Sequence, residues 1–165
     1  MKKRKRQKPI PGDIVSIKFD NSFHTYGRVL NFGDLAIYDC KSTEEKDDLQ
    51  EIIASKVILK VIVNIGGVEM GRWPIIGNVP LEISLQQSKY YVEEVGSSKK
   101  YQICDNGTYY YGLDESACIG IPYGGIWDPA HIEQILIDYY NRIDSEILKR
   151  NDVLGTYKMM WGIQR

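Results

Sequence analysis

Three pairs of adjacent carboxylic acids come closer to a catalytic pattern than other residues of this 165-residue chain. They are Asp47-Asp48, Glu93-Glu94 and Asp114-Glu115. Two neighbouring carboxyl groups can divide acid and base roles when a cleft raises the pKa of one of them. Each pair, however, lies in a segment expected to be a helix turn, a strand end or a loop, where charged side chains are usually solvated. We therefore expect these acids on the surface.

Nucleophilic and metal-binding residues are few. The cysteines, Cys40, Cys104 and Cys118, show no CxxC spacing, and the histidines are His24 and His131. A cysteine–histidine pair could activate a thiolate, but nothing in the sequence brings these residues together, and GxSxG, HExxH and P-loop motifs are absent. The counts also disfavour a zinc site and a disulfide framework. We expect no metal and no cofactor, with a small cysteine hydrolase as a minor alternative.

Tyrosine is the more unusual feature, because the chain contains twelve of them and several cluster in expected strands. Tyrosine provides rigid, amphipathic contact area, which suits a protein interface, although a core position is an equal alternative. The surface predicted to bind a partner consists of Asp47, Asp48, Glu51, Glu93, Glu94, Tyr109, Tyr111, Asp114 and Glu115. Residue types alone favour a binding module over an enzyme.

The net charge of −1 hides an uneven distribution. Six of the 21 basic residues lie within residues 1–8, so the remainder carries 15 basic and 22 acidic residues, a formal charge of −7. The basic segment is predicted to be a mobile arm, because its charges repel one another. The acidic remainder favours a basic protein partner and disfavours nucleic acid.

Targeting signals are not visible in the sequence. Apolar runs stay well below the ~20 residues of a membrane span, and the basic start lacks the apolar region of a secretory signal. We expect a protein that does not enter the membrane and that is located in the cytoplasm.

The elements that position these residues are mostly strands. Alternating apolar residues over 13–29, around a turn at 20–22, predict a β-hairpin, and residues 34–41 predict a third strand. The β-branched run 56–65 predicts a central strand covered on both faces. One further strand follows near 88–96, and two more form a hairpin over 99–112 with its turn at Asp105-Asn106-Gly107.

Two helices complete the prediction. Residues 42–55 predict a short amphipathic helix capped by Ser42 or Thr43, and residues 128–150 predict a long one, with Asp128 as N-cap and an apolar stripe that includes Ile143. The expected fold is α+β: a mostly antiparallel β-sheet or partly open barrel, one short inserted helix, and a long carboxy-terminal helix packed on the sheet. Residues 9–165 are predicted to form a single domain.

The segment EMGRWPIIGNVPLE, residues 69–82, is typical of either an active loop or a structural joint. Arg72 has no histidine, cysteine or serine near it in sequence, so we expect it to stack or to pair with a carboxylate. Trp73 is predicted to be mostly buried, and Gly77-Asn78 to form the turn that follows it. A structural joint is the favoured interpretation.

Five segments occur in this order: GDIVSIKF, LAIYDCK, EMGRWPIIGNVPLE, YQICDNG and GGIWDPAHIEQIL. Together they resemble the immunity protein 26 family of bacterial polymorphic-toxin systems, over about residues 9–140. The most specific part is the signature Gly71, Arg72, Trp73 and Gly77. The resemblance implies a cytoplasmic, non-enzymatic protein that binds and neutralises a cognate toxin encoded beside it, through the toxin's carboxy-terminal domain.

The resemblance does not imply the activity of the toxin. A nuclease with a basic substrate cleft would suit the acidic body of the chain. The alternative from a different class is a small nucleic-acid-binding β domain that uses the basic amino-terminal arm.

Overall fold

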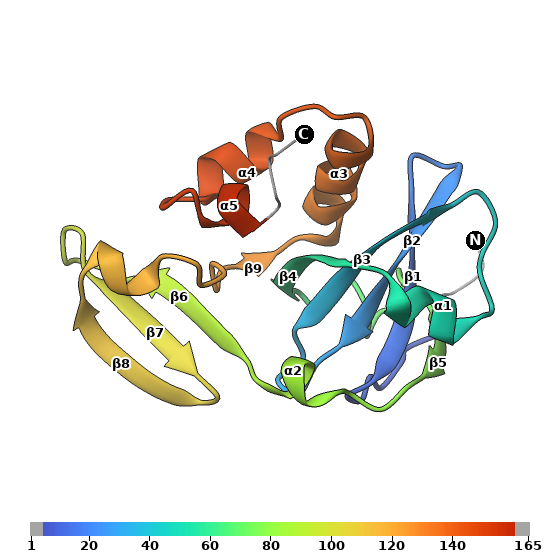
Figure 1. Ribbon diagram of the computed structural model, residues 1–165, viewed down its shortest axis with the longest axis horizontal. Coiled ribbons are helices and arrows are strands. Elements are labelled where there is room, and N and C mark those ends of the chain that lie inside the picture. Colours follow the sequence, from blue (N-terminus) through green and yellow to red (C-terminus); the bar gives the residue numbers. More distant parts are fainter. Residues whose placement is uncertain (1–4, 161–165) are drawn as a thin grey trace.

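Two β-sheets and a group of carboxy-terminal helices make up the computed structural model, which describes residues 5–160 (Figure 1). One sheet has six strands in the order β5-β1-β2-β3-β4-β9, and the other has three in the order β6-β7-β8. The strands are β1 (Asp13–Phe19), β2 (Phe23–Val29), β3 (Leu35–Ser42), β4 (Val57–Val63), β5 (Ile75–Asn78), β6 (Lys89–Glu93), β7 (Tyr101–Asp105), β8 (Thr108–Leu113) and β9 (Ile126–Trp127). The predicted α+β class is confirmed, and neither sheet closes into a barrel.

Both predicted hairpins form. β1 and β2 pair antiparallel around Asp20 and Asn21, whose φ angles of 49° and 51° are left-handed. β7 and β8 pair around Asn106 and Gly107, with φ angles of 49° and 84°. Asparagine and glycine tolerate this conformation, so their presence in the sequence predicted the position of both turns correctly.

The prediction that residues 56–65 form the central strand is wrong. β4 lies next to the edge of its sheet, and its outer neighbour β9 pairs with it over two residues only. The central positions belong to β2 and β3, which are largely buried. An apolar run indicates burial but not strand order, and here the order follows from the successive hairpins β1-β2-β3-β4.

The six-stranded sheet has an apolar core on each face. Alternation along β1 sends Val15 and Ile17 to the face covered by α3 and sends Ile14 to the face covered by α1. Helix α3 packs through Ile132, Ile135 and Leu136, whereas α1 packs through Ile52; these residues are completely buried.

Helix α1 (Leu49–Ala54) is shorter than predicted and begins later. Its N-cap is Asp48, whose carboxylate accepts hydrogen bonds from the amides of Gln50 and Glu51. Ser42, one of the two predicted caps, instead ends β3 and pairs with His24. Serine is a common N-cap residue, but Ser42 is still part of β3, so the helix begins later.

The predicted long helix is two helices, α3 (Pro129–Tyr140) and α4 (Glu146–Asn151), followed by α5 (Thr156–Met160). The beginning of α3 is as predicted, with Asp128 as N-cap and Pro129 in the first turn. The helix ends because Arg142 adopts φ 58°, while the amides of Arg142 and Ile143 donate to the carbonyls of Tyr139 and Asp138. This is a Schellman motif, and Ile143, predicted on the buried stripe, is 55% exposed.

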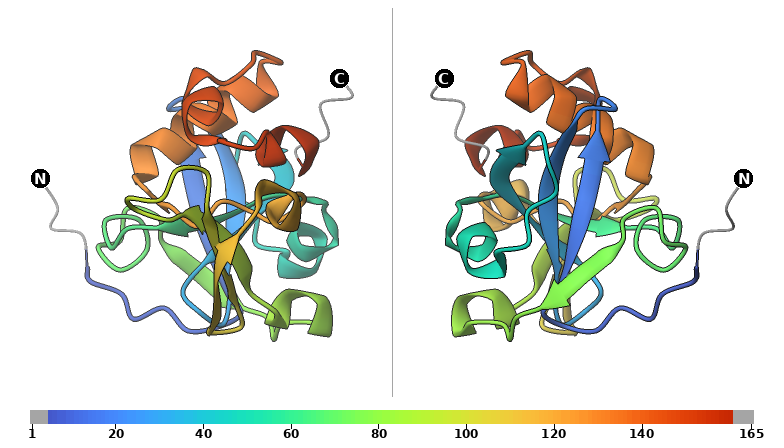
Figure 2. Two further views of the ribbon diagram at one scale, coloured as in Figure 1. Left: turned by 90° about the vertical axis from the view of Figure 1, so that its left-hand side faces the viewer. Right: turned by 90° about the vertical axis from the view of Figure 1, so that its right-hand side faces the viewer.

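The three-stranded sheet lies at one end of the molecule, and helices α3, α4 and α5 gather on one side of the two sheets (Figures 1 and 2). The connections to it contain α2 (Ile83–Gln86) and the 3-10 helix η1 (Glu115–Cys118). Buried Asp34 joins the sheets, because its Oδ2 accepts hydrogen bonds from the hydroxyls of Tyr90 at 2.6 Å and Ser88 at 3.2 Å. In the described part of the chain, no helix has the length and apolar character needed to cross a membrane.

Candidate functional site

The signature arginine and tryptophan are held by one carboxylate on α3. Glu133 Oε1 accepts hydrogen bonds from Arg72 Nε at 2.7 Å and from Trp73 Nε1 at 2.9 Å, and Oε2 accepts from Arg72 Nη2. The hydrogen bonds to Glu133 raise the pKa of the Arg72 guanidinium above its ordinary value. Trp73 is completely buried. The prediction that Arg72 pairs with a carboxylate and that Trp73 is a core residue is confirmed.

The two signature glycines have different causes, a left-handed backbone at Gly71 and a close side-chain contact at Gly77. Gly71 has a φ of 70°, which L side chains rarely adopt. Gly77 lies in β5, opposite Ile14, and a Cβ atom there would collide with the side chain of Leu49 on α1. The predicted turn at Gly77-Asn78 is therefore wrong, because glycine is present for a close approach between a strand and a helix.

Glu133 and Gln7 are structural residues that the sequence did not reveal. The Gln7 side-chain amide donates to the carbonyls of Val68 and Trp73 and accepts from the amide of Ile75. Gln7 lies within the predicted arm, of which residues 1–4 are outside the described residues. Helical periodicity puts Glu133 away from the apolar stripe of α3, and it cannot show that a loop folds over that face.

The residues predicted to bind a partner fall into two groups at opposite ends of the molecule (Figure 1). Asp47, Asp48 and Glu51 belong to α1 and the loop before it. The other six belong to the three-stranded sheet and η1: Glu93, Glu94, Tyr109, Tyr111, Asp114 and Glu115. One partner surface of ordinary size would contact one group only.

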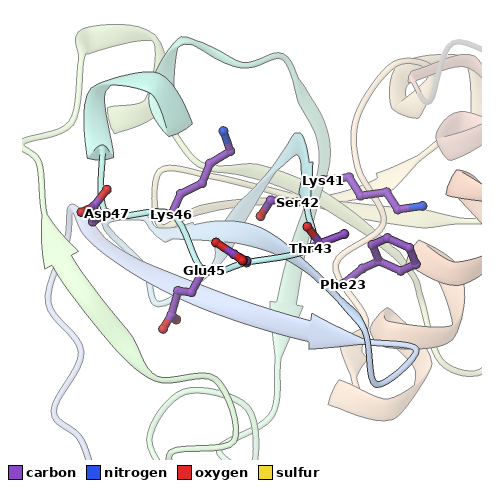
Figure 3. A pocket seen from close by; sticks show the side chains of 8 residues that line it. Phe23, Lys41, Ser42, Thr43, Glu45, Lys46 and Asp47 are labelled. Carbon is purple, nitrogen blue, oxygen red and sulfur yellow. The ribbon is translucent and has the colours of Figure 1, made fainter.

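The group at α1 is largely engaged within the protein. Asp48 caps the helix, and Glu51 forms an ion pair with Lys46. Asp47 lines an open hollow of about 660 Å³, and at its other end the Lys41 ammonium lies 3.8 Å from the centroid of the Phe23 ring (Figure 3). The lining is Phe23, Lys41, Ser42, Thr43, Glu44, Glu45, Lys46 and Asp47, which contains acids and lysines but no histidine or cysteine.

The group at the three-stranded sheet is here called the tyrosine end: Glu93, Glu94, Tyr109, Tyr110, Tyr111, Asp114 and Glu115. Tyr109 and Tyr111 lie on one face of this sheet and Tyr110 lies on the other. The three tyrosines are 52%, 51% and 65% exposed. The rings of Tyr109 and Tyr111 stack with centroids 6.3 Å apart. Glu94 accepts a hydrogen bond from the Gly112 amide, which ties β6 to β8 across the sheet.

Charges at the tyrosine end are partly paired. Lys100 Nζ lies 2.6 Å from Asp114 Oδ1, and this hydrogen bond lowers the pKa of Asp114. Glu93 and Glu115 are exposed, and both act on the neighbouring Tyr101, whose pKa is raised chiefly by burial. The surface therefore combines exposed aromatic rings with acids that remain open to a partner.

The twelve tyrosines differ in exposure, and three of them, Tyr123, Tyr139 and Tyr140, are half-buried. Six are buried: Tyr26, Tyr38, Tyr90, Tyr91, Tyr101 and Tyr157. The exposed tyrosines are three consecutive residues of β8, Tyr109, Tyr110 and Tyr111. Buried and exposed tyrosines are thus both present, and the exposed ones lie on β8.

Two of the cysteines and one histidine considered for a catalytic pair lie in different elements, since His24 is in β2 of the six-stranded sheet. Cys104 lies in β7 and Cys118 in η1, where burial raises the thiol pKa. His24 Nδ1 lies 2.9 Å from Ser16 Oγ in the other sheet, but Ser16 is only 2% exposed. Residues 5–160 also contain no group of three or more residues suited to hold a metal ion.

A family model, Immunity protein 26, matches residues 10–103, more than half of the chain. The chain belongs to the immunity protein 26 family. Comparisons with curated proteins and with solved structures gave no match.

The immunity protein 26 match covers the signature. It contains Gly71, Arg72, Trp73 and Gly77 and extends into β7, but it ends before β8 and α3. The expected likeness to about residue 140 is therefore supported as far as residue 103. Glu133, which holds Arg72 and Trp73, lies beyond the matched residues.

Proposed function

We propose that this protein binds a protein toxin encoded beside it and neutralises the toxin without catalysing a reaction. The observation that carries the proposal is membership of the immunity protein 26 family. An immunity protein of a polymorphic-toxin, contact-dependent inhibition system protects the cell that makes the toxin, so it acts in that cell's cytoplasm. The contacted part is the carboxy-terminal toxin domain.

The tyrosine end is the proposed contact surface. Exposed tyrosines provide contact area with little loss of conformational entropy, and buried aromatic residues carry much of the binding energy at interfaces. Tyr109, Tyr110 and Tyr111 are all more than half exposed, and the acids Glu93 and Glu115 of the same end are exposed as well. The acids at α1 are a weaker candidate, because Asp48 and Glu51 already serve the fold.

Charge supports a basic partner. The chain from residue 9 onward carries 22 acidic and 15 basic residues. A toxin with a basic substrate cleft, such as a nuclease, would meet opposite charge and associate faster. Neutralisation would then consist of occupying the cleft that the substrate needs.

The test uses the toxin domain encoded by the adjacent gene. We expect a stoichiometric complex on gel filtration and loss of toxic activity when the two proteins are mixed at equal concentration. Unchanged toxic activity together with separate elution of the two proteins would overturn the proposal.

Paired variants locate the surface. Tyr109→Ala combined with Tyr111→Ala is expected to weaken toxin binding at least about tenfold, as the loss of interface aromatics does. Asp47→Asn, at the opposite end of the molecule, is the matched control and should leave the affinity unchanged. The reverse result would place the toxin at α1.

A further inference from the structure

Strand β8 is an open edge of its sheet. The strand order ends at β8, and five of its six residues are exposed. The two edges of the larger sheet are shorter, since β5 has four residues and β9 has two. Among the described strands, β8 therefore offers the longest run of edge backbone on an exposed strand.

This edge carries few of the features that normally prevent edge-to-edge pairing. Lysine, proline and inward-pointing charges are the usual protection, and β8 reads Thr-Tyr-Tyr-Tyr-Gly-Leu. The one irregularity is a register shift at its far end, where Gly112 has a φ of 66°. Residues 108–110 keep the regular register, and the ring of Tyr111 still stacks on that of Tyr109, so this part of the strand is free to accept another strand.

Alternation identifies the groups that point outward. Asp105 and Thr108 flank a two-residue turn, where the flanking residues exchange backbone hydrogen bonds. Tyr110, two residues on, pairs with Ile103 in the same way. The backbone groups of Tyr109 and Tyr111 therefore point away from β7, and their stacked rings lie on one face of the sheet.

We propose that the toxin contacts this protein through an extended segment that pairs with β8 as a fourth strand. The inference rests on the proposed function and specifies its mode of binding. A paired strand would form hydrogen bonds with the backbone of Tyr109 and Tyr111, while its side chains would pack on the two rings.

Charge favours a basic toxin segment over a second copy of this chain. Residues 89–118 contain five acids and three lysines, and two of these lysines are already paired with Asp105 and Asp114. Glu115 follows β8 in the chain and is exposed, and Glu93, in β6 of the same sheet, is exposed as well. Two copies paired through β8 would bring the same acidic ends together, whereas a basic segment would meet opposite charge.

Residue-resolved amide hydrogen exchange tests the pairing. We expect the amides of Tyr109 and Tyr111 to exchange fast in the free protein and at least about tenfold more slowly in the complex with the toxin domain of the adjacent gene. Tyr110, already paired with β7, is the internal reference. A complex in which both rates stay unchanged overturns strand pairing while leaving the proposed function intact; absence of any complex overturns the proposed function itself.

A backbone variant provides an independent readout. Tyr109→Pro removes the ring and the outward N–H, whereas Tyr109→Ala removes the ring alone; an edge position tolerates proline. We expect the proline variant to bind the toxin domain at least about fivefold more weakly than the alanine variant. Equal affinities, with circular dichroism showing both variants folded, contradict the proposal.

Sedimentation of the free protein separates the two possible occupants. We expect a monomer at concentrations well above those of the binding assay. A dimer that Tyr109→Pro dissociates and Tyr109→Ala preserves would assign the edge to a second copy and would overturn the toxin as its occupant.

Discussion

Glu133 shows how one carboxylate can decide the role of a conspicuous motif. It accepts hydrogen bonds from both Arg72 and Trp73, and its side chain is only 18% exposed. An arginine beside a tryptophan could have indicated an active loop. Because both side chains are directed to one acid on α3, the signature segment is a structural joint between a loop and a helix.

Removing the indole from this joint is expected to be costly. Trp73→Ala should lower the free energy of unfolding by about 3–5 kcal/mol, because it leaves a large cavity in a completely buried site. Urea unfolding followed by circular dichroism measures the change. A loss below about 1 kcal/mol would contradict the assigned core role.

Removing the acid tests the same joint from α3. Glu133→Ala should lower the free energy of unfolding by about 2 kcal/mol, because the buried indole N–H and the Arg72 guanidinium lose their acceptor. Glu146→Ala, which breaks an exposed pair with Lys149 on α4, is the control and should change the unfolding midpoint much less. Similar losses for both variants would show that the joint contributes nothing beyond a surface ion pair.

Tyr91 links burial to the pH dependence of stability. Burial raises the pKa of Tyr91 to about 12 from its ordinary value of 10.0. The folded state favours the neutral hydroxyl of Tyr91. The contribution of this group to the free energy of unfolding is therefore complete below pH 10 and is lost as the pH rises from 10 through 12. Urea midpoints should fall over this range, and less steeply for Tyr91→Phe. Tyr110→Phe, on exposed β8, should follow the unchanged protein; an identical slope for all three would refute the assignment.

At the level of elements, the end of the carboxy-terminal helix was predicted wrongly from the sequence. The apolar stripe continued past Tyr140, yet a Schellman motif ends α3 with a non-glycine residue in the left-handed region. Arginine at this position gives no warning in the sequence, because glycine or asparagine is the usual indicator. Tertiary packing of α4 and its own cap at Ser145 then decide where the chain turns.

Arg142→Gly should stabilise the protein. A left-handed non-glycine residue costs about 1 kcal/mol or more, and glycine removes this cost at φ 58°. Thermal and urea unfolding should show a gain of about 1 kcal/mol. The neighbouring Asn141→Gly is the control, since Asn141 has an ordinary φ of −90° and should gain nothing. Destabilisation by Arg142→Gly would mean that the arginine side chain makes a contribution that outweighs the backbone strain.

At the scale of the whole molecule, charge and exposure are unevenly distributed. The acids form groups at both ends, but exposed aromatic rings accompany only the group at the three-stranded sheet among the residues described. Long-range attraction depends on net charge, whereas short-range affinity depends on groups that a partner can cover.

Association with a basic toxin should therefore slow as salt increases. We expect the association rate to fall about tenfold or more between 0.05 and 0.5 M salt, with a smaller change in dissociation rate. The double variant Glu93→Gln, Glu115→Gln should be slower than the unchanged protein at low salt and similar at high salt; stopped-flow fluorescence measures both. A rate that is independent of salt would contradict electrostatic steering.

Some features could be predicted because neighbouring residues determine them. Left-handed turn residues placed both hairpins, the Asp128 cap and Pro129 placed the start of α3, and the five ordered segments indicated the family. Burial of Trp73 followed from its size and apolar character. For the turns and for the start of α3, the physical cause lies within a few residues of the chain.

Other features required the tertiary structure because distant segments decide them. The strand order places β4 next to the edge of its sheet and not at its centre. Gly77 lies close to the side chain of Leu49 on α1. Arg72 donates to Glu133, which is 61 residues away in the sequence. The same holds for the nine predicted contact residues, which separated into two ends. The sequence by itself determined the family, the fold class and the local turns; only the packing of distant segments decided which side chains meet and which strand edge is left open.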